Sequence, residues 1–150
     1  LYGVWAANAN DVWAVGQSAT VMRHDNLKWK ALGVPLASKE LHAVWGSSPT
    51  EVWVGGVSGA AAVYDGTNWK KMPLATTGNL FAIWGDKKAL WGAGGRTVSS
   101  GPFEGALFYA SGAGWGPATS PSKAFLADLF GRTGAGPFVV GAQGTILRWQ

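Results

Sequence analysis

One pattern of 40 residues occurs twice in succession at the start of this chain, and it constrains the fold more than any other feature. Residues 1–32, LYGVWAANANDVWAVGQSATVMRHDNLKWKAL, align without a gap with residues 41–72, LHAVWGSSPTEVWVGGVSGAAAVYDGTNWKKM. Both copies hold two Val-Trp pairs, a glycine, an aspartate and a later tryptophan at the same positions. Self-similarity at this period indicates a repeat architecture in which each copy is one supersecondary unit.

A third copy begins at Leu80 with LFAIWG, and its next apolar run is ALWGAGG. Trp84 and Trp91 therefore occupy the two tryptophan positions. An insertion of about seven residues then follows Gly94, and the pattern resumes at Ala106 with ALFYASGAGW.

The fourth copy begins at Leu126 with LADLFG. Phe130 and Phe138 take the two tryptophan positions, and Trp149 takes the position of Tyr64. The sequence stops one apolar run short of a complete fourth copy.

Each unit divides into short apolar runs at clusters of Gly, Ser, Pro and Asp. In the second unit the runs are LHAVW, EVWVGG, AAAVYD and NWKKM. Such runs, rich in β-branched and aromatic residues and bounded by turn signals, predict strands. We expect an all-β fold, a β-propeller of four-stranded antiparallel blades with three complete repeats and a truncated fourth, fifteen strands in all. One domain over residues 1–150 would hold blades 1–40, 41–79, 80–125 and 126–150.

Regular placement of the largest side chain has a packing explanation. Propeller blades stack face to face, so a flat ring recurring on each strand fills the wedge between neighbours, and each indole would bury on the order of 200 Å². We expect this role for six tryptophans: Trp5, Trp13, Trp45, Trp53, Trp84 and Trp91. The alternative is a stacking platform for sugars or bases. Four glycines at the end of the second strand (Gly16, Gly56, Gly94 and Gly141) are expected to be turn residues with positive φ.

Composition excludes several classes of function. The chain of 150 residues carries a net charge of +4, but its lysines occur singly or in pairs, so we expect no nucleic-acid partner. It contains no cysteine, which excludes disulfides and zinc–thiolate sites. No apolar run approaches the length of about 20 residues needed to span a bilayer. Because the first residue already lies inside the repeat, we expect a mature segment or an excised fragment.

The pattern VWG-x4-[DE]VW-x2-G followed by YDGxxW resembles the Trp-rich β-propeller repeats of secreted and surface bacterial proteins. It is also similar to Asp-box and kelch propellers, in which an Asp/Gly turn joins the third and fourth strands and a tryptophan follows. Asp65, Gly66 and Trp69 match this hairpin, and Asn26 replaces the glycine in the first unit. In the third unit Ala110 is aligned with the aspartate. The resemblance implies an extracellular, periplasmic or cell-surface location.

No set of residues typical of catalysis converges in the sequence. Acids that recur in each unit would lie a blade apart, too far for the carboxylate pair of a glycosidase. His24 takes the position of Tyr64 and is expected to be structural, whereas His42 lies on a first strand and could line the central channel. We therefore expect no catalytic residue, no metal site and no cofactor.

Two groups of residues are candidates for ligand binding. The first would give a lectin with one carbohydrate site per blade, in which tryptophans stack on sugars beside the turn aspartates (Trp29, Trp69, Trp115, Asp25 and Asp65). The second lies in the insertion GGRTVSSGPFEG, residues 94–105, and comprises Arg96, Phe103 and Glu104. Loops on rigid scaffolds often carry recognition, although surface insertions are also tolerated without a role.

These observations favour a non-enzymatic recognition or scaffold module that binds protein or glycan through its loop surfaces. The alternatives are the lectin and a propeller that forms part of a larger hydrolase. Since most propellers close with about four to eight blades, we expect the chain to form part of a larger ring. A homodimer that closes one ring between two copies, and a four-bladed monomer, are the other choices.

Overall fold

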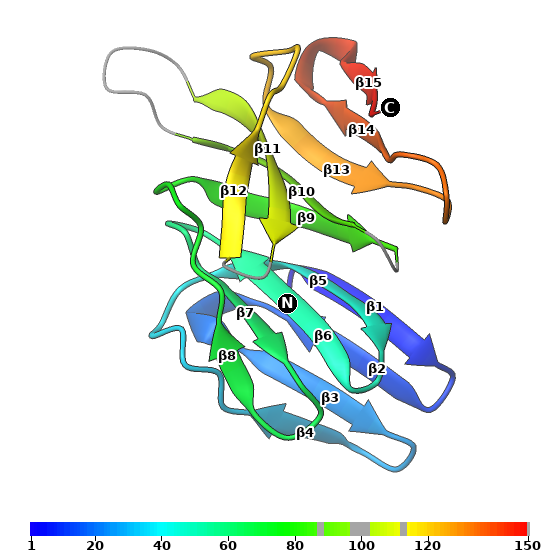
Figure 1. Cartoon of the computed structure of the whole chain (residues 1–150). Helices are drawn as coiled ribbons and strands as arrows, with labels where there is room; N and C mark the ends of the chain where they lie inside the picture. The colour runs from blue at the N-terminus through cyan, green and yellow to red at the C-terminus, as the bar shows by residue number, and fades with distance from the viewer. Residues whose placement is uncertain (87–88, 97–102, 112–113, 150) are drawn as a thin grey trace.

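The computed structural model describes residues 1–86, 89–96, 103–111 and 114–149. Within these ranges, fifteen strands form four antiparallel sheets, one for each sequence repeat, and we call the sheets blades 1 to 4. Figure 1 shows them fanned out in chain order, from the blue first blade to the red fourth. The expectation of an all-β fold with three four-stranded units and a three-stranded fourth is confirmed.

The strands follow the apolar runs of the sequence. Blade 1 holds β1 (Gly3–Asn8), β2 (Asp11–Val15), β3 (Val21–Asp25) and β4 (Trp29–Leu32). Blade 2 holds β5 (Leu41–Ser48), β6 (Glu51–Gly56), β7 (Ala61–Tyr64) and β8 (Trp69–Lys71). Blade 3 holds β9 (Asn79–Gly85), β10 (Leu90–Arg96), β11 (Glu104–Ser111) and β12 (Gly114–Ala118). Blade 4 holds β13 (Leu126–Phe130), β14 (Phe138–Gly141) and β15 (Ile146–Arg148).

Each blade is a simple meander in which consecutive strands pair. The first strands β1, β5, β9 and β13 are edge strands of their sheets, and β1 contacts β5, β5 contacts β9, and β9 contacts β13. They therefore form the inner wall of an arc. Single turns of 3-10 helix, η1 (Gln17–Ala19) and η2 (Ala142–Gly144), connect the second and third strands of blades 1 and 4. No helix in the described parts of the chain is long and apolar enough to cross a membrane.

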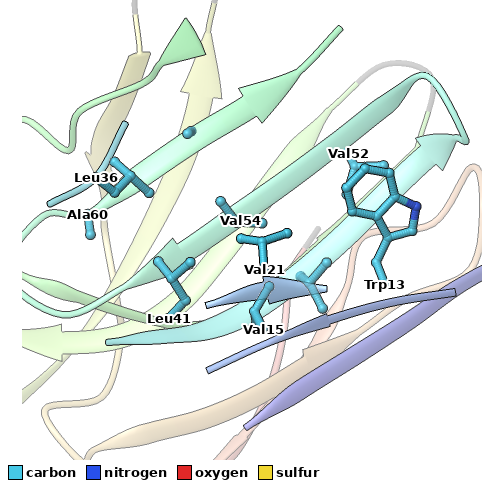
Figure 2. Packing of buried hydrophobic residues seen from close by; sticks show 10 residues of the cluster. Trp13, Val15, Val21, Leu36, Leu41, Val52, Val54 and Ala60 are labelled. Carbon is cyan, nitrogen blue, oxygen red and sulfur yellow. The ribbon is translucent and has the colours of Figure 1, made fainter. Parts of the chain in front are cut away.

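Apolar clusters lie between consecutive blades. The cluster between blades 1 and 2 joins Trp13, Val15 and Val21 to residues of blade 2 such as Val52 and Val54, as Figure 2 shows. Two further clusters occupy the interfaces of blades 2 and 3 and of blades 3 and 4. Side chains from both faces of the middle blades are thus buried, which explains why their strands are apolar without strict alternation.

The tryptophans of the first and second strands pack between blades, as expected. Trp13 is fully buried, and Trp84 nearly so. The other four (Trp5, Trp45, Trp53 and Trp91) are partly buried and pack against the same clusters. Tryptophan rings also meet across each interface. The ring centroids of Trp13 and Trp69 are 6.1 Å apart, those of Trp53 and Trp115 are 5.9 Å apart, and those of Trp91 and Trp149 are 4.8 Å apart.

The expectation of positive φ at the recurring glycine of the second strand is wrong. Gly16 and Gly141 are extended, with φ of −171° and −162°, and Gly56 and Gly94 are not among the residues with positive φ. The reason for glycine is close backbone approach instead. A Cβ at Gly56 would overlap the carbonyl oxygen of Glu40, and one at Gly94 would overlap that of Asn79. The position holds glycine because the chain entering each blade passes directly over it.

Strand pairing also corrects the alignment of the third unit. In blade 2, Trp69 lies opposite Tyr64, and in blade 3, Trp115 lies opposite Ala110. Ala110 is therefore equivalent to Tyr64, and Ser111 takes the place of Asp65. The alignment by sequence was displaced by one residue, although Ser111 precedes Trp115 by the same spacing as Asp65 precedes Trp69.

Candidate functional site

The first strands of all four blades line one cleft of about 350 Å³ at the inner wall of the arc. Its lining residues come in consecutive groups, all within the first strands except Tyr2, which directly precedes β1: Tyr2, Gly3 and Val4; His42, Ala43 and Val44; Phe81, Ala82 and Ile83; and Ala127 and Asp128. A cleft of this size falls at the lower end of the range for ligand sites, about 300–1,000 Å³. We call it the axial cleft.

Three aromatic rings from successive blades form a row along this cleft. The phenol ring of Tyr2 stacks on the imidazole of His42, with centroids 4.7 Å apart and planes 9° from parallel. His42 in turn meets the ring of Phe81 edge-on at 5.0 Å. The three residues are equivalent in the repeat, each being the residue after the leucine that begins the unit. The expectation that His42 could line the channel is confirmed.

The row continues into two phenylalanines at one end. The ring centroid of Phe81 lies 5.3 Å from that of Phe125, a residue that precedes blade 4, and 6.4 Å from that of Phe103. Phe103 and Phe125 lie 5.7 Å from each other. The five rings therefore form a continuous surface that spans blades 1 to 4, and we call it the aromatic row.

Phe103 brings part of the insertion into contact with Phe81, one of the residues that line the axial cleft. β10 and β11 pair as far as Arg96 and Glu104, so the hairpin extends beyond the start of β9, which is also the end where Phe81 lies. The predicted ligand residue Phe103 thus belongs to a row of rings that the sequence did not identify. Residues 97–102 of the insertion, including Thr97, Ser99 and Ser100, lie outside the described residues.

Charged groups surround the base of this hairpin. The carboxylate of Glu104 lies 3.4 Å from the guanidinium of Arg96 and 3.6 Å from the ammonium of Lys123. These three side chains line a second cleft of about 250 Å³, separate from the axial cleft, and two cations against one anion give it a net positive charge. At the other side of the row, the Nε2 atom of His42 lies 3.7 Å from a carboxylate oxygen of Glu40.

The turn aspartates have structural partners. In blade 2, the Oδ1 atom of Asp65 accepts hydrogen bonds from the backbone N–H groups of Thr67 and Asn68, at 2.9 and 2.7 Å. These backbone donors hold the pKa of Asp65 below its usual range. Gly66 in this turn has a φ of +96°, and its counterpart Asn26 has a φ of +70°. Asparagine tolerates this region, which explains the replacement of glycine.

In blade 1, Asp25 forms an ion pair with Lys30, and a hydrogen bond from that ammonium group is the main cause of its lowered pKa. Asp25 lies directly opposite Asp11 in the sheet, and Asp11 binds the guanidinium of Arg23 with two hydrogen bonds of 2.9 and 2.6 Å. That contact raises the pKa of Arg23. Each of the two opposed carboxylates thus has its own cation.

The three tryptophans after the turns differ in exposure. Trp115 is only 2% exposed, so its ring offers no open face to a sugar. Trp69 is partly buried and packs against Trp13 and Tyr64. Trp29 is 48% exposed, but the repeat places it where Trp69 packs on a neighbouring blade. The structure therefore does not present three equivalent stacking faces beside the turn aspartates.

Sequence reasoning did not identify Tyr2, Phe81 and Phe125 as site residues. A signal was present, because Tyr2, His42 and Phe81 are rings at equivalent positions on strands predicted to lie nearest the axis. Only their spatial row, however, separates them from packing residues. Among the described residues, no group of three or more His, Asp or Glu side chains could hold a metal ion.

Comparison with solved structures supports the architecture. The structure described as YCF48 bound to D1 peptide matches with a TM-score of 0.70 at 17% sequence identity, covering 99% of this chain and 49% of that one. The WD40 β-propeller domain of Doa1 matches with a TM-score of 0.53 at 11% identity, covering 97% of this chain and 66% of that one. The chain folds as an arc of a β-propeller.

The present chain spans about half the length of the first of these proteins and about two thirds of the second, as the covered shares of 49% and 66% state. No protein-family model matches the sequence, and no curated protein does so either. At these identities the likeness concerns the fold alone.

Proposed function

We propose that this propeller is a non-catalytic recognition module that binds an extended protein segment along the aromatic row of the axial cleft. The observation that carries the proposal is the continuity of Tyr2, His42 and Phe81 across three blades. Aromatic rings supply large contact areas at low conformational cost and dominate binding energies at protein interfaces.

The backbone beside the row supports an extended ligand. β1, β5, β9 and β13 are the first strands of their sheets and pair with a strand on one side only. Their other edges face the axis, where a bound segment could hydrogen-bond with the main chain while its side chains contact the rings. A similar propeller, YCF48, has been solved with a D1 peptide, which supports a protein partner for this fold.

Charge suggests which segments bind best. Arg96 and Lys123 outnumber Glu104 in the second cleft, which adjoins the phenylalanine end of the row because Glu104 follows Phe103 and Lys123 lies two residues before Phe125. A segment with apolar side chains along the row and an acidic group at this end would be complementary to the site. The resemblance of the repeats to those of secreted and surface proteins supports a location outside the cytoplasm.

A random linear peptide library displayed on phage tests this proposal. Selection on the immobilised protein should enrich peptides with aromatic or aliphatic residues and an acidic group. Tyr2→Ala and His42→Ala should each weaken binding of a selected peptide by about 30-fold, the effect of losing a hot-spot side chain. Leu27→Ala, at an exposed hairpin tip, serves as the matched control and should leave the affinity unchanged.

Binding to a glycan array with several equivalent weak sites, reduced by one site in Trp29→Ala and unaffected by Tyr2→Ala, would instead support the lectin. A reproducible hydrolase activity abolished by substitution of one acid would contradict a non-catalytic role. No structural observation favours either alternative, because Trp115 is buried and the turn aspartates hold their own turns or partners.

A further inference from the structure

The two ends of the arc expose faces that are buried elsewhere in the repeat. Val4 of blade 1 is 70% exposed, whereas the equivalent Val44 of blade 2 is 9% exposed and packs against blade 1. At the other end, Phe130 is 75% exposed, although its counterpart Trp84 is 7% exposed and packs against blade 4. Within the described residues, no blade packs on the outer face of blade 1 or of blade 4.

Both open faces are apolar over several strands. The face of blade 4 carries Phe130, Phe138, Val140 and Ile146, all exposed. Strand pairing sets Phe130 opposite Phe138 and Val140 opposite Ile146, so each pair shares one side of the sheet. Exposed contiguous apolar surface of this kind marks an interaction site.

The three interfaces between consecutive blades show which residues face each other when two blades pack. At every internal interface, the first-strand tryptophan of one blade lies over a glycine at the end of the next first strand. A Cβ on Gly46 would lie 2.6 Å from Trp5, one on Gly85 would lie 3.1 Å from Trp45, and one on Gly131 would lie 2.7 Å from Trp84. The six-membered part of the indole occupies the space that a methyl group would need.

The outer faces of blades 4 and 1 both differ from this Trp–Gly contact, and the two differences compensate each other in size. Blade 4 presents Phe130 in place of tryptophan, and blade 1 presents Ala6 in place of glycine. A phenyl ring is shorter than an indole by about the size of the methyl group that alanine adds. Tryptophan on a neighbour would collide with Ala6, and glycine on a neighbour would leave a void beneath Phe130.

The second-strand position of the repeat also supports packing of blade 4 on blade 1. Trp13 packs against Tyr64 and Trp69 of the next blade, and Arg23 lies over its ring at 4.8 Å. On the open face of blade 4, Arg148 lies over Phe138 at 5.7 Å in the same register. The equivalents of Tyr64 and Trp69 on blade 1 are His24 and the exposed Trp29, which would receive Phe138.

We propose that a second copy of this chain covers both end faces, with blade 4 of each copy packed on blade 1 of the other. Two identical head-to-tail contacts would then close one ring of eight blades, within the range in which propellers close. Blades 4 and 1 of the same chain do not pack on each other, because Val4 and Phe130 both remain exposed.

Analytical ultracentrifugation of the 150-residue chain tests the proposal. The expected particle at micromolar concentration has twice the chain mass of 15.6 kDa. Val4→Glu and Phe130→Glu should each weaken the dimer on the order of 100-fold, because each places a charge at both contacts of the ring. Leu27→Glu, an apolar-to-charge change at a hairpin tip, should leave the mass unchanged.

The compensating sizes of Phe130 and Ala6 give a sharper test. Phe130→Trp should weaken the dimer about tenfold or more by collision with Ala6, and adding Ala6→Gly should restore it by recreating the internal Trp–Gly contact. An equimolar mixture of the Val4→Glu and Phe130→Glu variants should form a weak dimer through the one contact that remains intact. All four positions are exposed or at an open edge of the isolated chain, and circular dichroism should confirm that each variant is folded.

Several results would overturn the proposal. A folded monomer at all accessible concentrations would contradict it, as would a dimer unaffected by Phe130→Glu, which would indicate contact between two first blades. Oligomers that keep growing with concentration would show that the contact does not close. Failure of Ala6→Gly to rescue Phe130→Trp would show that Phe130 does not pack on Ala6 of a second copy.

Discussion

The indole of Trp5 in blade 1 lies over Gly46 of blade 2 so closely that a Cβ on this glycine would be 2.6 Å from Cη2 of the ring. Gly46→Ala should therefore destabilise the fold by about 1–3 kcal/mol through overpacking. Urea unfolding at a fixed protein concentration measures the loss. The backbone itself tolerates a Cβ here, because Ala6 occupies the equivalent position of blade 1 with no ring above it.

The matched rescue is Trp5→Phe in the Gly46→Ala background, which should recover part of the lost free energy of unfolding. Recovery is expected to be partial because the carbonyl oxygen of Glu51 also lies 2.8 Å from that Cβ position. If the double variant is as unstable as the sum of the single variants, the ring is not the cause.

Trp13→Ala tests the wedge between blades 1 and 2. Trp13 is fully buried and contacts Tyr64 and Trp69 of the next blade, so its loss should cost about 3–5 kcal/mol. Leu27→Ala removes a large side chain at an 84% exposed position and should change stability by less than about 0.5 kcal/mol. Similar urea midpoints for the two variants would refute the role of Trp13 as a wedge.

The sequence predicts those parts of the structure that recur at equivalent positions of the repeat. The blades, their four strands and the buried tryptophans follow from spacing, because equivalent positions in a solenoid or ring have equivalent surroundings. The recurring glycine of the second strand was identified, but its cause was not. Close approach of the entering chain to Gly56 depends on tertiary geometry that no local pattern encodes.

The candidate site was predicted only in part for the same reason. Phe103 was selected as a departure from the repeat, and its ring does contact Phe81, which lines the axial cleft. Tyr2 and Phe81 obey the repeat and therefore looked like packing residues, although their row spans three blades. Trp115 followed the hairpin motif, yet its burial between blades removes the open face that the motif suggested.

The turn of blade 2 gives a prediction for pH. Because the folded-state pKa of Asp65 is lowered by backbone N–H donors, its stabilising effect is complete above the unfolded pKa of about 3.9 and is lost as pH falls through the folded value. Asp65→Asn should lower the melting temperature at neutral pH. The difference from the wild type should shrink in strongly acidic solution.

Thermal unfolding followed by circular dichroism over an acidic pH series measures this effect. Thr67→Ala serves as the control, because it retains the backbone N–H that Asp65 binds and should preserve the pH dependence. A difference between Asp65→Asn and the wild type that stays constant down to strongly acidic pH would contradict the assigned hydrogen bonds.

The most direct test of the account is the footprint of a selected peptide on the isotope-labelled protein, measured by NMR chemical-shift perturbation. Binding along the aromatic row predicts the largest shifts at Tyr2, His42 and Phe81, extending to Phe103, with those at Asp65 and Trp69 unchanged. Shifts centred on the hairpins of Asp25 and Asp65, or spread equally over the blades, would contradict recognition at the axial cleft.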